Sequence, residues 1–103
     1  MAYYYTNIVS LDEEIVVLWL NWMTDVHIPE IFSDNIFSDF VMQRVIKSDS
    51  TYQDRTTYIV TYECKSVEKY EQYVNEIEPL ARKQFFGSYL GMYSIQRYFG
   101  ESS

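Results

Sequence analysis

Residues 10–26 read SLDEEIVVLWLNWMTDV and carry the clearest periodic pattern of the chain. Apolar side chains recur there at intervals of three and four residues: Ile15, Leu18, Trp19, Trp22, Met23 and Val26. This spacing places them on one face of an α-helix. Ser10 followed three residues later by Glu13 is the pattern of a capping box, in which each side chain satisfies a free backbone amide. We therefore expect a helix over residues 12–26.

The chain should leave this helix at a proline. Pro29 has no backbone N–H and disfavours helical geometry at the preceding residue, so the helix should end or bend near His27. A polar hairpin loop is expected over residues 47–55. Runs of β-branched and aromatic residues predict four strands, at residues 3–9, 40–46, 56–64 and 92–99.

A second helix should follow the third strand. Ser66 can cap its start, and apolar residues recur at near-helical intervals as far as Phe85. Pro79 interrupts this pattern, so a kink or a restart is expected at Glu78-Pro79. Gly87 should cap the C-terminal end.

The resulting order is strand, helix, strand, strand, helix, strand. This order predicts an α+β fold of the ferredoxin-like type, βαββαβ, with a four-stranded antiparallel sheet and both helices on one face. A chain of 103 residues has the size of one domain, and no stretch is rich enough in Pro, Gly or Ser to be a linker. Residues 1–103 should therefore form a single domain.

The other face of the sheet should also be covered. Aromatic and aliphatic residues occur at both alternating sets of positions in the first and fourth strands, including Tyr4 and Tyr5, and Tyr98 and Phe99. A face exposed to water would be polar at every second position. We expect a two-fold homodimer that pairs these sheet faces, although another partner or a ligand would satisfy the same pattern.

Composition limits the cellular setting and the partners. The formal net charge of −7 and the pI near 4.5 argue against a surface for nucleic acid or anionic membranes. The longest apolar run, residues 15–20, is too short to span a membrane. A single cysteine and the lack of a signal-peptide pattern predict a cytoplasmic protein.

Two short segments and a later dipeptide resemble a known family. The segments Trp19-Leu20-Asn21-Trp22-Met23 and His27-Ile28-Pro29-Glu30, with Phe86-Gly87, resemble domain of unknown function 4286, a small bacterial family. The resemblance spans most of the chain and implies a ferredoxin-like fold. More distantly, the His after the first helix is similar to dimeric α/β-barrel families, which include cofactor-free monooxygenases, isomerases and dehalogenases. The family has no assigned catalytic residue to transfer, and shared fold does not fix chemistry.

His27 is the only histidine and the natural candidate for a catalytic acid or base. In dimeric α/β barrels the first helix borders a pocket between helices and sheet, so His27 could project into it. Trp19, Trp22 and Met23 would then line a site for a small apolar or aromatic ligand, with Arg44 as an anion partner. A structural role for His27, at the negative end of the helix dipole, is the alternative.

A metal site or a cofactor site finds little support. Asp25, His27 and Glu30 could offer three ligands, but Pro29 breaks the helical face that would align them. One His and one Cys cannot build a tetrahedral zinc site within the chain. The three glycines do not form a phosphate cradle, so we expect no metal and no cofactor.

Three functions remain open. The first is a dimeric α/β-barrel protein that binds a small ligand between the first helix and the sheet. The second is a non-enzymatic module whose aromatic sheet face binds another protein. The third is an enzyme of the cofactor-free monooxygenase or isomerase type. The sequence alone leaves open whether the protein is an enzyme.

Overall fold

Four antiparallel strands form one sheet. The structure, a computed structural model, describes residues 2–49 and 55–103. The strands are β1 (Tyr3–Asp12), β2 (Phe37–Arg44), β3 (Arg55–Cys64) and β4 (Tyr93–Glu101), in the spatial order β2-β3-β1-β4. Part of the predicted hairpin loop, residues 50–54, lies outside the described residues.

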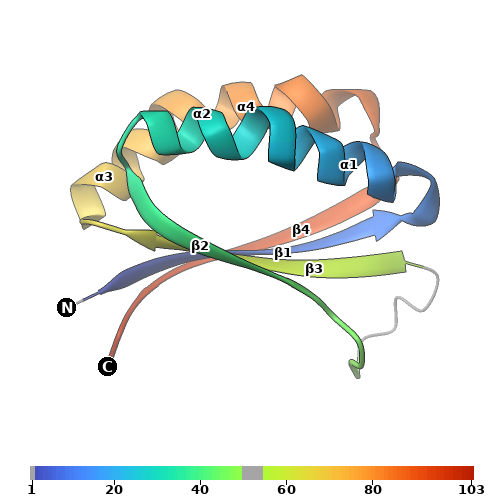
Figure 1. Cartoon of the computed structure of the whole chain (residues 1–103), viewed down its shortest axis with the longest axis horizontal. Coiled ribbons are helices and arrows are strands. Elements are labelled where there is room, and N and C mark those ends of the chain that lie inside the picture. The colour runs from blue at the N-terminus through green and yellow to red at the C-terminus, as the bar shows by residue number, and fades with distance from the viewer. Residues whose placement is uncertain (1, 50–54) are drawn as a thin grey trace.

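Two helical runs lie across one face of this sheet (Figure 1). The first consists of η1 (Glu13–Ile15), α1 (Val16–Trp22), η2 (Met23–His27) and α2 (Ile28–Ser33). The second consists of α3 (Val67–Gln72), η3 (Tyr73–Ile77), α4 (Glu78–Phe85) and η4 (Phe86–Ser88). This is the ferredoxin-like βαββαβ fold that the sequence predicts. Within the described parts of the chain, no helix combines the length and the apolar character needed to cross a membrane.

The first helix was expected to end or bend near His27. It does not end there, because the helical run continues through Pro29 to Ser33, but its regular α-helical pattern is interrupted at this point. A π-helical turn, η2, directly precedes the proline region, and the N–H of Ile28 donates to the carbonyl of Met23, five residues back. This wider turn absorbs the missing N–H of Pro29 without breaking the helix. The second run has the same kind of π turn: the N–H of Glu78 donates to the carbonyl of Tyr73, five residues back and just before Pro79.

Two of the predicted helix caps were wrong. Ser10 lies in β1, where its hydroxyl pairs with that of Thr57 at 2.9 Å, and Asp12 caps the helix start by accepting from the N–H of Glu14. The strand is longer than the sequence pattern indicated, so the cap moves two residues along. Gly87 lies inside the 3-10 turn η4 and does not adopt a left-handed conformation. Ser66 does cap α3, as predicted, by accepting from the N–H of Lys69.

The core lies between the helices and one face of the sheet. On β3 the alternating residues Tyr58, Val60, Tyr62 and Cys64 are all buried, as the strand pattern predicts. The first helical run buries every fourth residue against them: Ile15, Trp19, Met23, His27 and Ile31. In a regular α-helix every fourth residue is rotated by about 40° relative to the last, so the later members of the series would turn away from the sheet. The wider π turn rotates the following residues back, so His27 and Ile31 again face the sheet. Leu18, which the periodic pattern placed on this face, is instead 47% exposed.

The open face of the sheet carries two uncharged rows of side chains. Strand register aligns Val41, Thr61, Thr6 and Tyr98 in one row and Gln43, Ile59, Ile8 and Gln96 in the next. Tyr62 belongs to the opposite face, where it is 1% exposed. It is therefore a core residue and could not form part of a sheet-to-sheet interface.

Candidate functional site

A cavity of about 50 Å³ lies between the helices and the sheet. Its walls come from β1, β3, β4 and both helical runs, so it is enclosed by the two layers of the fold. Of the residues that line it, only Arg82 and Arg97 are exposed; the others are buried or half-buried. These two arginines therefore mark the mouth of the cavity.

The two π turns direct side chains into this cavity. Met23 and His27 are the first and last residues of η2, and both are buried. Tyr73 begins η3, and Glu78 follows five positions later, at the start of α4; both are again buried. Met23 and His27 are four residues apart and would share a face of a regular α-helix too, but residues five apart, such as Tyr73 and Glu78, would point in different directions. The extra residue in the π turn brings Tyr73 and Glu78 to the same side, and such turns are frequent at functional sites.

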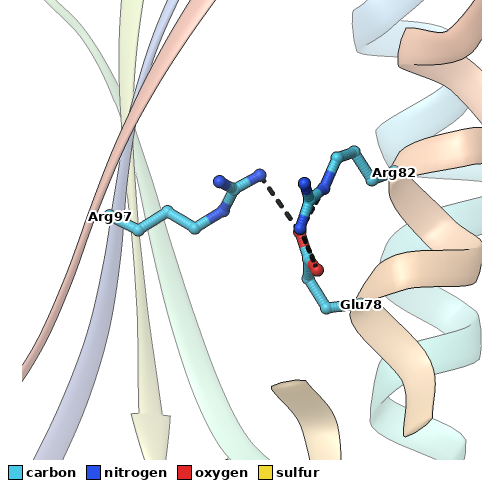
Figure 2. A network of polar contacts seen from close by, with 3 residues as sticks. All are labelled: Glu78, Arg82 and Arg97. Atoms are coloured by element: carbon cyan, nitrogen blue, oxygen red, sulfur yellow. Dashed lines mark hydrogen bonds and ion pairs between the residues drawn. The ribbon is translucent and has the colours of Figure 1, made fainter. Parts of the chain in front are cut away.

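Glu78 is a buried carboxylate held between two arginines from different layers (Figure 2). Arg82, one turn along α4, donates from Nε to Oε1 at 2.8 Å and from Nη2 to Oε2 at 2.6 Å. Arg97 extends from β4 toward the same carboxylate and places Nη2 3.1 Å from Oε1. A buried carboxylate requires such pairing, because burying an unpaired charge is costly.

Three residues that line the cavity each carry a buried polar atom without a hydrogen-bond partner among the described residues. These atoms are Oδ1 of Asn7, Nε1 of Trp22 and Nδ1 of His27. Buried polar atoms in native proteins are almost always hydrogen-bonded, to protein or to ordered water. Three orphans around one cavity therefore point to a molecule that occupies it.

Ring stacking holds two of these atoms in place. The Trp22 and His27 rings lie 4.5 Å apart at 17°, and the Phe85 ring lies 5.2 Å from Trp22 at 28°. Burial lowers the pKa of His27 to about 4, an effect that the nearby Glu78 carboxylate partly opposes. The imidazole is therefore neutral at neutral pH, with one nitrogen protonated.

Buried tyrosines complete the polar wall. Burial raises the pKa of Tyr5 to about 12, while the Arg97 guanidinium opposes the shift. Burial also raises the pKa of Tyr62 and of Tyr73. All three phenols are neutral and can donate a hydrogen bond.

The structure brings together four of the five residues that the sequence analysis selected. Trp19, Trp22, Met23 and His27 all line the cavity. Arg44 lies exposed at the end of β2, an edge strand, and does not line it. Of the three residues weighed as a metal site, His27 is buried but Asp25 and Glu30 are exposed. Within residues 2–49 and 55–103 no three His, Cys, Asp or Glu side chains gather as metal ligands would.

The sequence analysis missed the polar half of the site: Asn7, Glu78, Arg82 and Arg97. Glu78 and Arg82 are four residues apart, which is the spacing of an ordinary exposed ion pair on a helix. Asn7 offered a better signal, because it is an amide amid β-branched and aromatic residues on the helix-facing side of a central strand.

The fold and this cavity define the class of protein. The chain has the fold of the dimeric ferredoxin-like proteins, with a pocket between the helices and the sheet. It belongs to the family DUF4286, a domain of unknown function, whose model matches residues 1–99. The resemblance noted in the sequence is thereby confirmed. No curated protein matches the sequence.

Solved structures share the whole fold at low sequence identity. A dimeric ferredoxin-like protein from an uncultured marine organism is 14% identical, with a TM-score of 0.69 over 98% of this chain and 94% of that one. An ethyl tert-butyl ether d (ethd) family protein from Bacillus halodurans is 13% identical, with a TM-score of 0.68 over 100% of both chains. A candidate monooxygenase from Shewanella loihica is 13% identical, with a TM-score of 0.60 over 100% of this chain and 97% of that one. At these identities the likeness is one of fold.

Proposed function

We propose that this protein binds a small molecule in the cavity between its first helical run and its sheet. The observation that carries the proposal is the group of three unpartnered polar atoms, on Asn7, Trp22 and His27, around one cavity. They come from both layers, so a single bound molecule can satisfy groups on the helix and on the sheet together. Ligand sites commonly combine apolar walls with a few convergent polar groups of this kind.

The size of the cavity limits the ligand. At about 50 Å³ the cavity is small beside a cavity of roughly 150 Å³ that binds benzene, so it suits a molecule of only a few non-hydrogen atoms. An aromatic ligand would therefore require the half-exposed Arg82 side chain at the mouth to move. The aromatic walls around Trp22 would suit a flat molecule once that has happened.

The test is an NMR titration of the ¹⁵N-labelled protein with small fragments: acetate, acetamide and phenol. Binding in the cavity should shift the indole N–H signal of Trp22 in a saturable way, and the Trp22→Phe variant identifies that signal. Leu90→Ala, at an exposed position away from the cavity, is a matched control and should leave the titration unchanged. If no fragment shifts the signal, the cavity holds only water and the proposal fails.

A second candidate is proton-transfer catalysis by His27, as in a cofactor-free monooxygenase or isomerase. The unpartnered Nδ1 in the cavity favours it. A pKa of about 4 makes His27 a weak base, however, since general bases work best with a pKa near the operating pH. With a discovered substrate, His27→Gln should abolish turnover if His27 is catalytic; retained turnover would leave binding as its only role.

We also propose that two copies pair through the open face of the sheet. The two uncharged rows on this face support the pairing, because Ile8, Val41, Ile59 and Tyr98 hold positions where a solvated face would be polar. Light scattering should give twice 12.4 kDa across a range of concentrations. A monomer would instead favour the alternative, an interaction module whose sheet face binds a different protein.

For the compartment we propose the cytoplasm. The only cysteine, Cys64, is a buried free thiol, which suits a reducing environment. Fractionation of cells that express the tagged protein should recover it with the cytosolic fraction, and recovery from a secreted fraction would refute this assignment.

A further inference from the structure

The wall of the cavity carries an excess of positive charge, although the chain is acidic. Its charged lining residues are Glu78, Arg82 and Arg97, so the two guanidinium groups exceed the carboxylate by one charge. The chain as a whole has a formal net charge of −7. A positively charged pocket in an acidic protein is a local feature, and it favours an anionic occupant.

Arg97 has hydrogen-bonding capacity beyond its contact with Glu78. Arg82 already engages both carboxylate oxygens of Glu78, whereas Arg97 reaches the carboxylate through Nη2 alone. A guanidinium group has five N–H donors. Even with the Tyr5 hydroxyl beside it, Arg97 therefore keeps donors for a further acceptor.

Two of the three unpartnered groups can act as donors, and both belong to residues that line the cavity. The indole nitrogen of Trp22 can only donate. A neutral His27 carries one N–H, which the tautomer can place on Nδ1. The unpartnered Oδ1 of Asn7 is an acceptor, and only an exchange of the two terminal atoms of the amide would present a donor at its position. A ligand rich in acceptor atoms would satisfy the Trp22 and His27 donors, and a carboxylate is such a ligand.

The remaining wall accepts an apolar group. Val9, Val60 and Ile95 line the cavity from three neighbouring strands. Chloride would leave this surface without a partner, whereas acetate places a methyl group there. Acetate is also among the smallest carboxylates, which suits a cavity of about 50 Å³.

We propose that the ligand of this cavity is a small monocarboxylate of about the size of acetate, held by Arg97 and the Trp22 indole N–H. The proposal rests on the proposed ligand site and adds the charge class of its ligand. Charge-assisted hydrogen bonds to a carboxylate are stronger than neutral ones. Such bonds are electrostatically stronger in a protein interior than in water, and most of the residues that line this cavity are buried.

The experiment compares acetate with acetamide, its neutral isostere, at constant ionic strength and neutral pH. The indole N–H signal of Trp22 reports binding. Acetate should bind at least about tenfold more tightly than acetamide, with a dissociation constant in the millimolar range expected of so few atoms. Sodium chloride at the same ionic strength should not displace acetate.

Arginine variants locate the charge that binds. Arg97→Gln should weaken acetate binding by about tenfold or more, since it removes the cationic partner. Arg44→Gln, a matched change at an exposed site away from the cavity, should leave it unchanged. If Arg97→Gln fails to fold, Arg97→Lys keeps the charge and should retain part of the affinity while losing the forked geometry.

The outcomes separate this inference from the proposed function. Equal binding of acetate and acetamide, unaffected by Arg97→Gln, would overturn the anion inference and leave a site for small neutral ligands. Binding of phenol or acetamide without acetate would do the same. If acetate, acetamide and phenol all fail to bind, both proposals fall.

Discussion

The burial of His27 makes a quantitative prediction about the pH dependence of stability. The residue is 7% exposed, and desolvation lowers its pKa from 6.5 to about 4 in the folded protein. Between these two pH values the unfolded chain binds the proton and the folded chain does not. Stability therefore falls as pH drops through this window, by about 1.4 kcal/mol per pH unit and about 3 kcal/mol in all. Above pH 6.5 the contribution of His27 is complete.

The assay is urea unfolding of the wild type and of His27→Gln at several pH values from neutral to about 4. Carboxyl groups also titrate in this range, so the informative quantity is the difference between the two proteins. The wild type should lose about 3 kcal/mol more than the variant between neutral pH and pH 4. As the only histidine, His27 also gives a single imidazole NMR signal whose titration reports its pKa directly. A pKa near 6.5, or parallel pH profiles for the two proteins, would refute the reasoning.

Three further predictions concern the ion network, the sheet face and the buried phenols. Glu78→Gln should lower the free energy of unfolding by about 2 kcal/mol, which is less than usual for a broken buried pair because the Arg82 and Arg97 side chains are 53% and 33% exposed. The control Glu76→Gln, at an exposed position, should lower it by less than about 0.5 kcal/mol. Equal losses for the two variants in thermal or urea unfolding would contradict the role of the network. Ile8→Glu, on the open sheet face, should give monomers by light scattering. The control Val17→Glu, at a 67% exposed position on α1, should leave the dimer intact. If each of the two variants is still a dimer, the interface lies elsewhere. In alkaline titration Tyr5 should ionise near pH 12 unless the protein unfolds first, so stability should fall as pH rises above 10; an ionisation near pH 10 in the folded protein would show that its hydroxyl is solvated.

Much of the fold could be predicted from local pattern alone. The alternation in β3 and the apolar stripe of the first helix depend on burial against one neighbouring layer, which a single sequence records directly. Helix caps were predicted less well. Ser10 has the residue type and spacing of a cap, but pairing with β3 extends the strand past it. Tertiary pairing of this kind overrides a local signal.

The same contrast between local pattern and tertiary contact holds for the residues of the candidate site. Trp19, Trp22, Met23 and His27 were selected because they lie on or next to one helical stripe. Glu78 and Arg97 were missed because their contact joins a helix to a strand, and neither residue signals the other within its own element. The apolar half of the site could thus be inferred from periodicity, whereas the polar half depends on contacts between layers.

The two π turns explain why the site lies where the prolines do. In each helical run the π turn ends two residues before the proline. The first turn is associated with the cavity residues Met23 and His27, and the second with Tyr73 and Glu78. A regular α-helix would give up a hydrogen bond at each proline and, in the second run, would turn either Tyr73 or Glu78 away, because these two are five residues apart. The sequence predicted an end or a bend near His27 and a kink or a restart at Glu78-Pro79. The structure has a π turn before each proline, and a new α-helical segment begins at Ile28 and at Glu78. The prolines therefore mark the wider turns that place His27 and Glu78 on the wall of one cavity.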